Sequence, residues 1–365
     1  MANPIQSQDL VIHVLNVGFG DNILIEFPAD SEGQRSYGLV DCRNSVKTRR
    51  YLNKLMEIRP GRSQLAFVCA THPHLDHISG IKPLLTSNKY RPAEFWDSGF
   101  RHNSDTYHKI LKTLLDERIK VVRVSSGMEW YFSKVQITAL APSVSLRNRY
   151  TTYGVDMNNG SIVLRLEHRR EDMLLMRSRE YTGNASLEAE RQAGRSVVIL
   201  AGDAEFDSWA QIAYEFPRLE RTTKHVTLVK RMVNYLACSV VKVAHHGSMH
   251  STPLDVYEKM APELAIVSTE QEVSAKKMDG EKWERGLFPH QSAILALKEC
   301  GGRIVTTDGS YESQPVAPGQ NRDPQLAHPG SIVVVLPPGG KPRWTKLHDG
   351  RGDVPDPPTE VERDS

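Results

Sequence analysis

The chain has 365 residues, enough for one large domain or two ordinary ones and for a substantial buried core. Its 46 Lys and Arg residues nearly balance 44 Asp and Glu residues, so its net charge of +2 does not by itself demand nucleic acid or an anionic membrane as partner. No run approaches the roughly 20 apolar residues of a membrane span, and the N-terminus lacks a signal-peptide pattern, so we expect a cytoplasmic protein with no membrane partner.

Short apolar runs rich in valine and isoleucine recur along the chain and predict β-strands. They span residues 11–17, 22–27, 37–41, 65–70, 121–124, 135–140, 161–166, 196–203, 240–246, 264–269, 302–307 and 331–336. Segments typical of helices lie between them at residues 45–58, from about residue 81, and at 105–119, 206–216, 254–260 and 291–300. Strands followed by helices occur twice, which indicates a two-layer sheet core covered by helices rather than a simple β-α-β alternation.

Two polar regions set the expected domain organisation. Residues 168–195 are highly charged and interrupt two strand-like runs, which indicates a surface insertion in a domain that spans residues 1–348. Residues 349–365 show no apolar periodicity, and three prolines lie in their last fifteen positions, so we expect a disordered tail.

The sequence THPHLDH follows the apolar run at residues 65–70 and places four potential metal ligands in one loop: His72, His74, Asp76 and His77. The first two histidines are two positions apart, so an extended backbone points them the same way, while the other two residues follow as the chain turns into a helix. Imidazole and carboxylate groups suit zinc, manganese or iron, and this cluster exceeds the needs of one tetrahedral ion. It therefore predicts two metals that share a site.

Two later strand-like runs also end at ligand-type residues. Residues 196–203 end at Asp203, and residues 240–246 end at His245 and His246. Strands that deliver such residues to one rim can assemble a metal site on a rigid scaffold. Taken alone, Asp203 could equally be a helix N-cap.

The motif H-x-H-x-D-H, together with these two strand ends, resembles the metallo-β-lactamase fold superfamily. Further segments resemble the soluble hydrolase domain of ComEC-type DNA-uptake competence proteins, in the same order from about residue 10 to about residue 345: GFGD at 18–21, LVD at 39–41, NNGSIVL at 158–164, LAGD at 200–203, KVAHHGS at 242–248, FPHQSAIL at 288–295 and VTTDG at 305–309. The resemblance implies an αββα sandwich, in which two mixed β-sheets pack face to face with helices outside.

The resemblance also implies a distribution of ligands: His72 and His74 hold the first metal, Asp76 and His77 hold the second, and Asp203 bridges them. One histidine of the pair at 245–246 then completes the second site. We favour His245 because it comes first off the strand, which leaves His246 to orient a ligand or to face the substrate.

Most zinc-binding members of the superfamily supply a third histidine to the first metal, but here the matching position is NNGS. Asn158 or Asn159 is there either a weak oxygen ligand or a cap of the turn. Because the first metal has fewer ligands, manganese becomes a serious alternative to zinc for the two divalent ions.

Other polar residues are candidates for supporting roles. Asp41 ends a strand at the same rim and is expected to orient a ligand histidine, while Asp21 either does likewise or forms its turn. His290 and Ser248 are candidates for contact with a substrate phosphate, and the alternative for His290 is a position at the start of the helix at 291–300.

We therefore expect a metal-dependent phosphodiesterase or nuclease, with a bridging hydroxide oriented by Asp76 and with DNA or a nucleotide as candidate substrate. Basic segments at 101–109 and 218–231 favour nucleic acid, but charged helix faces are common. One alternative is a hydrolase of a small ester, lactone or phosphocholine-type substrate, because the fold does not fix the substrate. A second is a sensor or binding module with a weakened site.

Overall fold

The computed structural model describes residues 2–59, 61–62, 64–153, 156–168, 196–216, 219–221, 231–233, 235–270, 288–313 and 327–362. One mixed sheet is built from β2 (Leu10–Val14), β3 (Asn22–Glu26), β4 (Tyr37–Cys42), β5 (Phe67–Ala70), β6 (Glu94–Asp97), β7 (Lys120–Arg123), β17 (Ile332–Leu336) and β18 (Arg343–Lys346). Its order is β18-β17-β2-β3-β4-β5-β6-β7, and β4 to β7 run parallel. The carboxyl ends of these parallel strands therefore meet at one rim.

The second mixed sheet contains β8 (Glu129–Phe132), β9 (Val135–Ala141), β10 (Val163–His168), β11 (Val197–Leu200), β14 (Val240–Lys242), β15 (Leu264–Val267) and β16 (Arg303–Thr306). Its order is β16-β15-β14-β11-β10-β9-β8, and β11, β14, β15 and β16 are parallel neighbours. Two small pairs complete the described strands: β1 (Ala2–Pro4) with β19 (Glu360–Glu362), and β12 (Leu219–Arg221) with β13 (Arg231–Val233).

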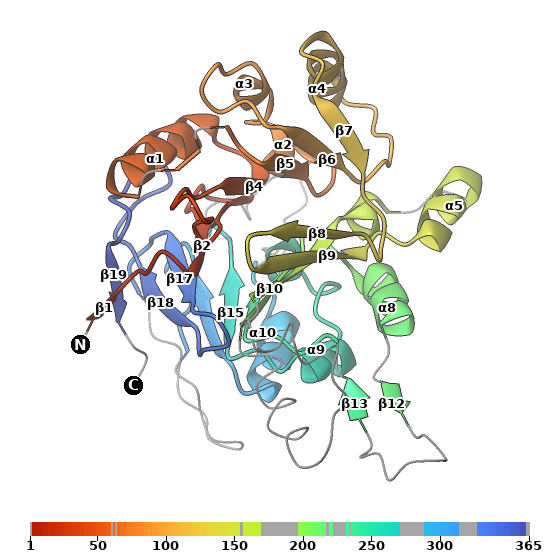
Figure 1. Ribbon diagram of the computed structural model, residues 1–365. Coiled ribbons are helices and arrows are strands. Elements are labelled where there is room, and N and C mark those ends of the chain that lie inside the picture. The colour runs from red at the N-terminus through yellow and green to blue at the C-terminus, as the bar shows by residue number, and fades with distance from the viewer. Residues whose placement is uncertain are drawn as a thin grey trace, which may run out of the picture.

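Helices cover the outer faces of the two sheets (Figure 1). The first sheet carries α1 (Ser45–Ile58), α2 (Leu75–Ile78), α3 (Lys82–Leu85) and α4 (Asp105–Asp116). The second carries α8 (Phe206–Glu215), α9 (Leu254–Met260) and α10 (Gln291–Glu299), while α5 (Val144–Tyr153) projects beside α8. Side-chain caps begin the two longest helices: Asn44 accepts a hydrogen bond from the Lys47 backbone in α1, and Ser104 accepts one from Tyr107 in α4.

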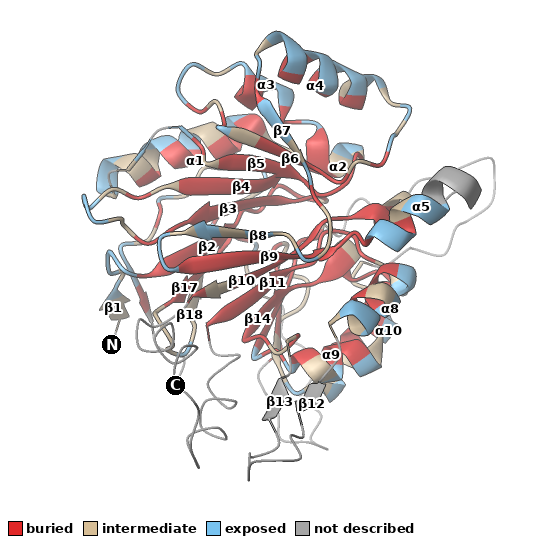
Figure 2. Cartoon of the chain, turned by 45° about the vertical axis from the view of Figure 1, so that its right-hand side comes forward, coloured by how far each residue is buried: buried red, intermediate tan, exposed pale blue. Residues whose placement is uncertain are grey.

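Most buried apolar residues of the described ranges form three layers (Figure 2), and a fourth small cluster contains Val11, Val333, Val335 and Val361. The central layer lies between the sheets, where the rings of Phe67 and Trp96 stack at 3.8 Å. The other two layers lie between each sheet and its helices. Full burial of one such aromatic side chain contributes roughly 1.5–3 kcal/mol, so the inter-sheet layer holds the sandwich together. The predicted αββα sandwich is confirmed.

The predicted tail at residues 349–365 and the predicted insertion at 168–195 compare differently with the structure. The prediction of disorder from residue 349 onward is wrong for residues 349–362, because β19 pairs with β1 and the buried carboxylate of Asp349 accepts a hydrogen bond from Lys47 Nζ at 2.6 Å. Composition alone hides this anchor, because a single buried ion pair leaves no apolar periodicity. The predicted insertion at 168–195 lies outside the described residues except for His168, which is buried at the end of β10. Within the basic segment at 218–231, residue 218 and residues 222–230 also lie outside them.

Candidate metal centre

The sequence-predicted ligands converge at the rim where both sheets present the carboxyl ends of their parallel strands. β5 leads into the THPHLDH loop, β11 into Asp203, and β14 into the pair His245-His246. The histidine pair has φ values of 46° and 53°, in the left-handed region, so the chain reverses directly after β14. Gly202, with φ 51°, packs where an added Cβ would come within 3.1 Å of Ser161 and Thr71. These backbone features bring the strand ends close together.

Four side chains at this rim offer ligand atoms that all lie within 4.8 Å of one another: Asp76, His77, Asp203 and His246. His77 Nε2 lies 3.2 Å from Asp203 Oδ1 and 3.6 Å from Asp76 Oδ2, and His246 Nε2 lies 3.4 Å from Asp76 Oδ2. The Nε2 atoms of both histidines and Oδ1 of Asp203 are buried and make no hydrogen bond. Buried polar atoms without partners are costly, so this donor set fits a divalent cation that would satisfy them together.

The opposite ring nitrogen of each histidine is already held. His77 Nδ1 donates to Asp41 Oδ2 at 2.7 Å, and His246 Nδ1 donates to the backbone carbonyl of Ser268 at 2.7 Å. His72 Nδ1 lies 3.2 Å from the hydroxyl of Thr71, which itself donates to Asp41. In a neutral ring with Nδ1 protonated, each Nε2 would have its lone pair free, which is the tautomer that a metal ligand needs.

A second set of contacts lies on the other oxygen of Asp203. Asp203 Oδ2 is 3.5 Å from His72 Nε2 and 3.9 Å from His245 Nε2. His74 lies beside His72, with ring centroids 4.5 Å apart. The two oxygens of Asp203 therefore face different histidines, as a carboxylate between two ions would.

The electrostatics agree with a cation site. Burial lowers the pKa of His72 well below its ordinary value. Burial also acts to lower the pKa of His77, but the carboxylates of Asp203, Asp41 and Asp76 outweigh it and raise that pKa well above its ordinary value. Burial acts to raise the pKa of Asp203, yet the imidazoles of His77 and His72 hold it well below its usual range. A bound cation would take the place of the proton that these carboxylates keep on His77.

Two predicted supporting carboxylates lie directly behind His77. Asp41 accepts from His77 Nδ1 and from the backbone N–H and hydroxyl of Thr71, so it fixes the loop as well as the ring. Asp21 forms a buried ion pair with Lys242, with Oδ2 and Nζ 2.6 Å apart. Sequence reasoning overlooked Lys242, although the KVAHHGS motif contains it.

The asparagines of NNGS occupy different positions. Asn159 Oδ1 accepts from the backbone of Ser208 in the first turn of α8, so it supports that helix. Asn158 Nδ2 lies 3.2 Å from Glu205 Oε1, which also lies 2.9 Å from His245 Nδ1. Sequence reasoning overlooked Glu205 as well, because its contact with His245 forms only in the folded chain.

The remaining candidates lie around the cluster. Ser248 is buried in the turn after the histidine pair, where its hydroxyl accepts a hydrogen bond from the backbone of His250. His290 is the N-cap of α10 and its ring accepts a hydrogen bond from the Ser292 backbone. The structure therefore gives His290 the alternative position that the sequence left open, outside the ligand group.

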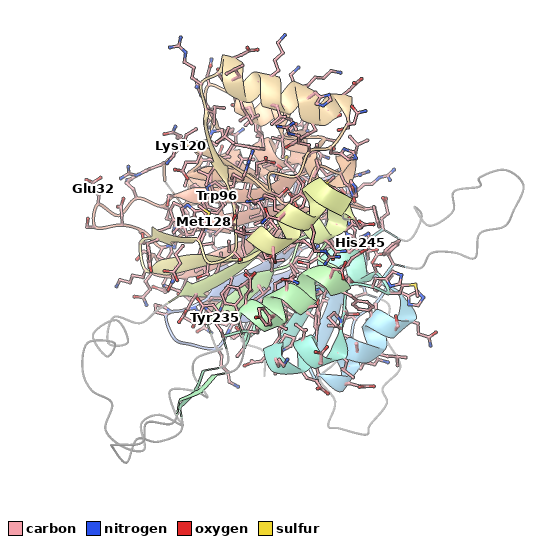
Figure 3. The ribbon with its side chains drawn as sticks, turned by 90° about the vertical axis from the view of Figure 1, so that its right-hand side faces the viewer. Glu32, Trp96, Lys120, Met128, Tyr235 and His245 are labelled. Carbon is pink, nitrogen blue, oxygen red and sulfur yellow. The ribbon has the colours of Figure 1, made fainter. Side chains whose placement is uncertain are left out.

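His245 lies at the rim, whereas Trp96 belongs to the inter-sheet core (Figure 3). The structure brings together the ligand atoms of Asp76, His77, Asp203 and His246, so His246 lies in this group and His245, which the sequence led us to prefer, does not. The preference assumed that the residue nearest the strand faces the site, but the left-handed backbone at both positions removes that alternation.

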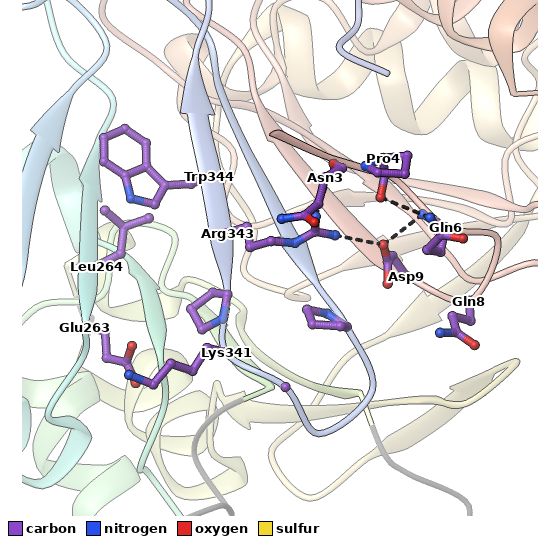
Figure 4. A pocket seen from close by; sticks show the side chains of 13 residues that line it. Asn3, Pro4, Gln6, Gln8, Asp9, Glu263, Leu264, Lys341, Arg343 and Trp344 are labelled. Carbon is purple, nitrogen blue, oxygen red and sulfur yellow. Dashed lines mark hydrogen bonds and ion pairs between the residues drawn. The ribbon is translucent and has the colours of Figure 1, made fainter. Parts of the chain in front are cut away.

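A separate cavity of about 610 Å³ lies at the opposite end of β15, lined by the N-terminal segment and the hairpin of β17 and β18 (Figure 4). Arg343 pairs there with Asp9 at 3.2 Å. The cavity contains none of the ligand residues, so it is not part of the candidate centre.

The two-sheet sandwich and the ligand motifs at its rim define a protein of the metallo-β-lactamase fold. Among curated proteins the chain is similar to ComE operon protein 3 of Bacillus subtilis (strain 168), with 22% identity over 315 residues. That alignment covers 84% of this chain and 33% of the relative, so the chain spans about one third of that protein's length. The predicted resemblance to the competence proteins is thus confirmed. No family model matches the chain.

Solved structures with similarity to the chain include the metallo-β-lactamase fold protein YhfI from Bacillus subtilis, with 13% identity, a TM-score of 0.42 and coverage of 82% of this chain and 96% of that one. A metallo-β-lactamase from Staphylococcus aureus shows 10% identity and a TM-score of 0.31, with coverage of 58% of this chain and 51% of that one. Among the described residues, no helix is long and apolar enough to cross a membrane.

Proposed function

We propose that this chain is a hydrolase that uses two divalent ions, zinc or manganese, to cleave phosphodiester bonds. One observation carries the proposal: buried ligand atoms without partners face one another at the rim, namely the Nε2 atoms of His72, His77 and His246 and Oδ1 of Asp203. We assign His72 and His74 to the first ion, Asp76, His77 and His246 to the second, and Asp203 to both. A sensor with a weakened site would not need to keep this set.

When bound, two such ions would lower the pKa of a water and neutralise charge on a phosphoryl oxygen. The two carboxylates of the group differ in access, because the side chain of Asp203 is 2% exposed and that of Asp76 is 21% exposed. A water that enters from solvent therefore meets Asp76, which we assign to accept its hydrogen bond and orient it. Asp203, the more buried of the two, would bind both ions.

The choice of a phosphodiester, with DNA or a nucleotide as candidate, is supported by the resemblance to the competence proteins. A small ester or lactone is the second candidate, since exposed apolar side chains adjoin site residues in sequence. Leu75, Phe206 and Met249 are 57%, 47% and 50% exposed, and an apolar substrate group could pack on them.

Hydrolysis of bis(4-nitrophenyl) phosphate tests the proposal, beside 4-nitrophenyl acetate, a lactone, single- and double-stranded DNA, RNA and cyclic nucleotides. We expect chelation to abolish diester cleavage, zinc or manganese to restore it, and Asp203→Asn to remove it in a folded protein. Asp97→Asn is the matched control, because Asp97 ends the neighbouring strand β6 and binds Tyr107 instead. Metal-loaded protein that cleaves the ester or lactone but no phosphodiester would contradict the assignment.

A further inference from the structure

Once His246 is assigned to the second ion, His245 has no assigned role. Its ring is nevertheless held at the rim by a neighbouring carboxylate. Its Nδ1 lies 2.9 Å from Glu205 Oε1, and Asn158 Nδ2 lies 3.2 Å from that same oxygen. Glu205 stands at the N-cap of α8 but its side chain makes no capping hydrogen bond. The carboxylate is therefore directed at His245 rather than at its own helix.

The two oxygens of the Asp203 carboxylate contact different histidines. His77 Nε2 lies against Oδ1, at 3.2 Å, in the group assigned to the second ion. His72 Nε2 and His245 Nε2 lie against Oδ2, at 3.5 and 3.9 Å. His72 and His245 are thus the imidazoles whose Nε2 atoms approach the Oδ2 side of Asp203.

The tautomer of His245 matches that of the other ligands. A carboxylate at Nδ1 keeps the proton there and leaves the Nε2 lone pair directed toward Asp203. A carboxylate that binds the far nitrogen of a ligating imidazole is a common arrangement around metals, because it fixes the ring and raises its basicity.

We infer that His245 is the third imidazole ligand of the first ion, oriented by Glu205, and that the pair His245-His246 gives one ligand to each ion. This inference rests on the proposed function. Asn158, at the position where the superfamily's third histidine was expected, then supports Glu205 through its amide group. The first ion is no longer short of ligands.

The inference changes the expected metal. Three imidazoles, from His72, His74 and His245, with one carboxylate oxygen from Asp203 make a four-ligand set of the kind that zinc takes in tetrahedral sites. Manganese prefers sites richer in oxygen. We therefore expect the first site to select zinc over manganese.

Metal content tests the inference without reference to turnover. Wild-type protein and variants are stripped with chelator, reloaded with zinc, freed of excess metal and measured for zinc per chain. Asparagine replaces His245 and His246 because it tolerates the positive φ of both positions, and its side chain is too short to reach the ion as imidazole does. We expect two ions in the wild type, one in His245→Asn, one in His246→Asn and none in the double variant of both.

Two further variants separate a ligand from a merely structural residue. The double variant His74→Asn with His245→Asn should still hold one ion, because both residues serve the same site. Glu205→Ala should keep both sites but bind the first ion about 10- to 100-fold more weakly. His250→Asn, in the same turn, is the control and should hold two ions.

The outcomes distinguish this inference from the proposal on which it rests. Folded His245→Asn that retains two ions at wild-type affinity would overturn the inference and leave the dinuclear hydrolase standing. The same holds if the His74 and His245 double variant loses both ions. A wild-type protein that binds no zinc or manganese at all would overturn both.

Discussion

The substitution Asp41→Asn should weaken binding of the second metal ion, because it changes which ring nitrogen of His77 carries the proton. Asp41 Oδ1 accepts from the Thr71 backbone N–H at 2.8 Å, so the oxygen of the new amide must stay there, since an NH₂ group would meet a donor. The amide nitrogen then occupies the place of Oδ2, 2.7 Å from His77 Nδ1, and donates to it. The proton of His77 moves to Nε2, and the lone pair that faces Asp203 is lost.

The expected magnitude follows from this tautomer change. Loss of the carboxylate behind a ligating histidine typically reduces metal affinity about 10- to 100-fold, or about 1.4–2.7 kcal/mol. The backbone should tolerate the change, because asparagine adopts positive φ values such as the 56° of Asp41. We therefore expect a folded protein that is defective in one of its two sites.

Calorimetric titration of metal-free protein with zinc measures this effect. Asp41→Asn should weaken one binding event and leave the other near its wild-type affinity. Asp97→Asn, the same substitution at the end of β6, should leave both events unchanged. Wild-type affinity at both sites in Asp41→Asn would refute the reasoning that Asp41 sets the tautomer of His77.

Three further predictions concern buried charges in metal-free protein. Lys242→Met leaves Asp21 buried without its cation and should lower the free energy of unfolding by about 3–5 kcal/mol, whereas an unchanged urea midpoint would contradict this. Asp349→Ala leaves the buried ammonium of Lys47 without its carboxylate partner and should lower the free energy of unfolding by about as much. A wild-type urea midpoint would show that this segment does not anchor the chain. Burial lowers the pKa of His13, so below its unfolded value of 6.5 the unfolded chain takes up a proton that the folded chain does not, and stability is lost. His13→Gln should show a shallower loss as the pH falls below 6.5 in urea titrations at each pH, and equal slopes would count against it.

The strands that form the core were predictable because they are apolar on both faces. The missed strands are of another kind: Glu94–Asp97, Glu129–Phe132 and Arg343–Lys346 mix charged and aromatic residues, and Glu129–Phe132 lies at a sheet edge. Glu129–Phe132 pairs with β9 and Arg343–Lys346 pairs with β17, the adjacent strands in sequence, so their mixed composition rather than distant partners conceals them. The segment after residue 348 was missed for a different reason, since Asp349 finds Lys47 only in the folded chain.

Some positions of the candidate site could be predicted from the sequence and others could not. The position of the THPHLDH loop and of Asp203 at one rim was predictable because each directly follows an apolar strand. The choice between His245 and His246 was not, because it depends on two consecutive left-handed residues. Glu205 escaped notice because its role appears only when α8 brings it to His245.

Anomalous diffraction from crystals of the zinc-loaded protein tests the central claim most directly. The account predicts two zinc peaks on either side of the Asp203 carboxylate. One peak should be bound by His72, His74 and His245, and the other by Asp76, His77 and His246. A single peak, or no peak at this rim, would contradict the two-metal site.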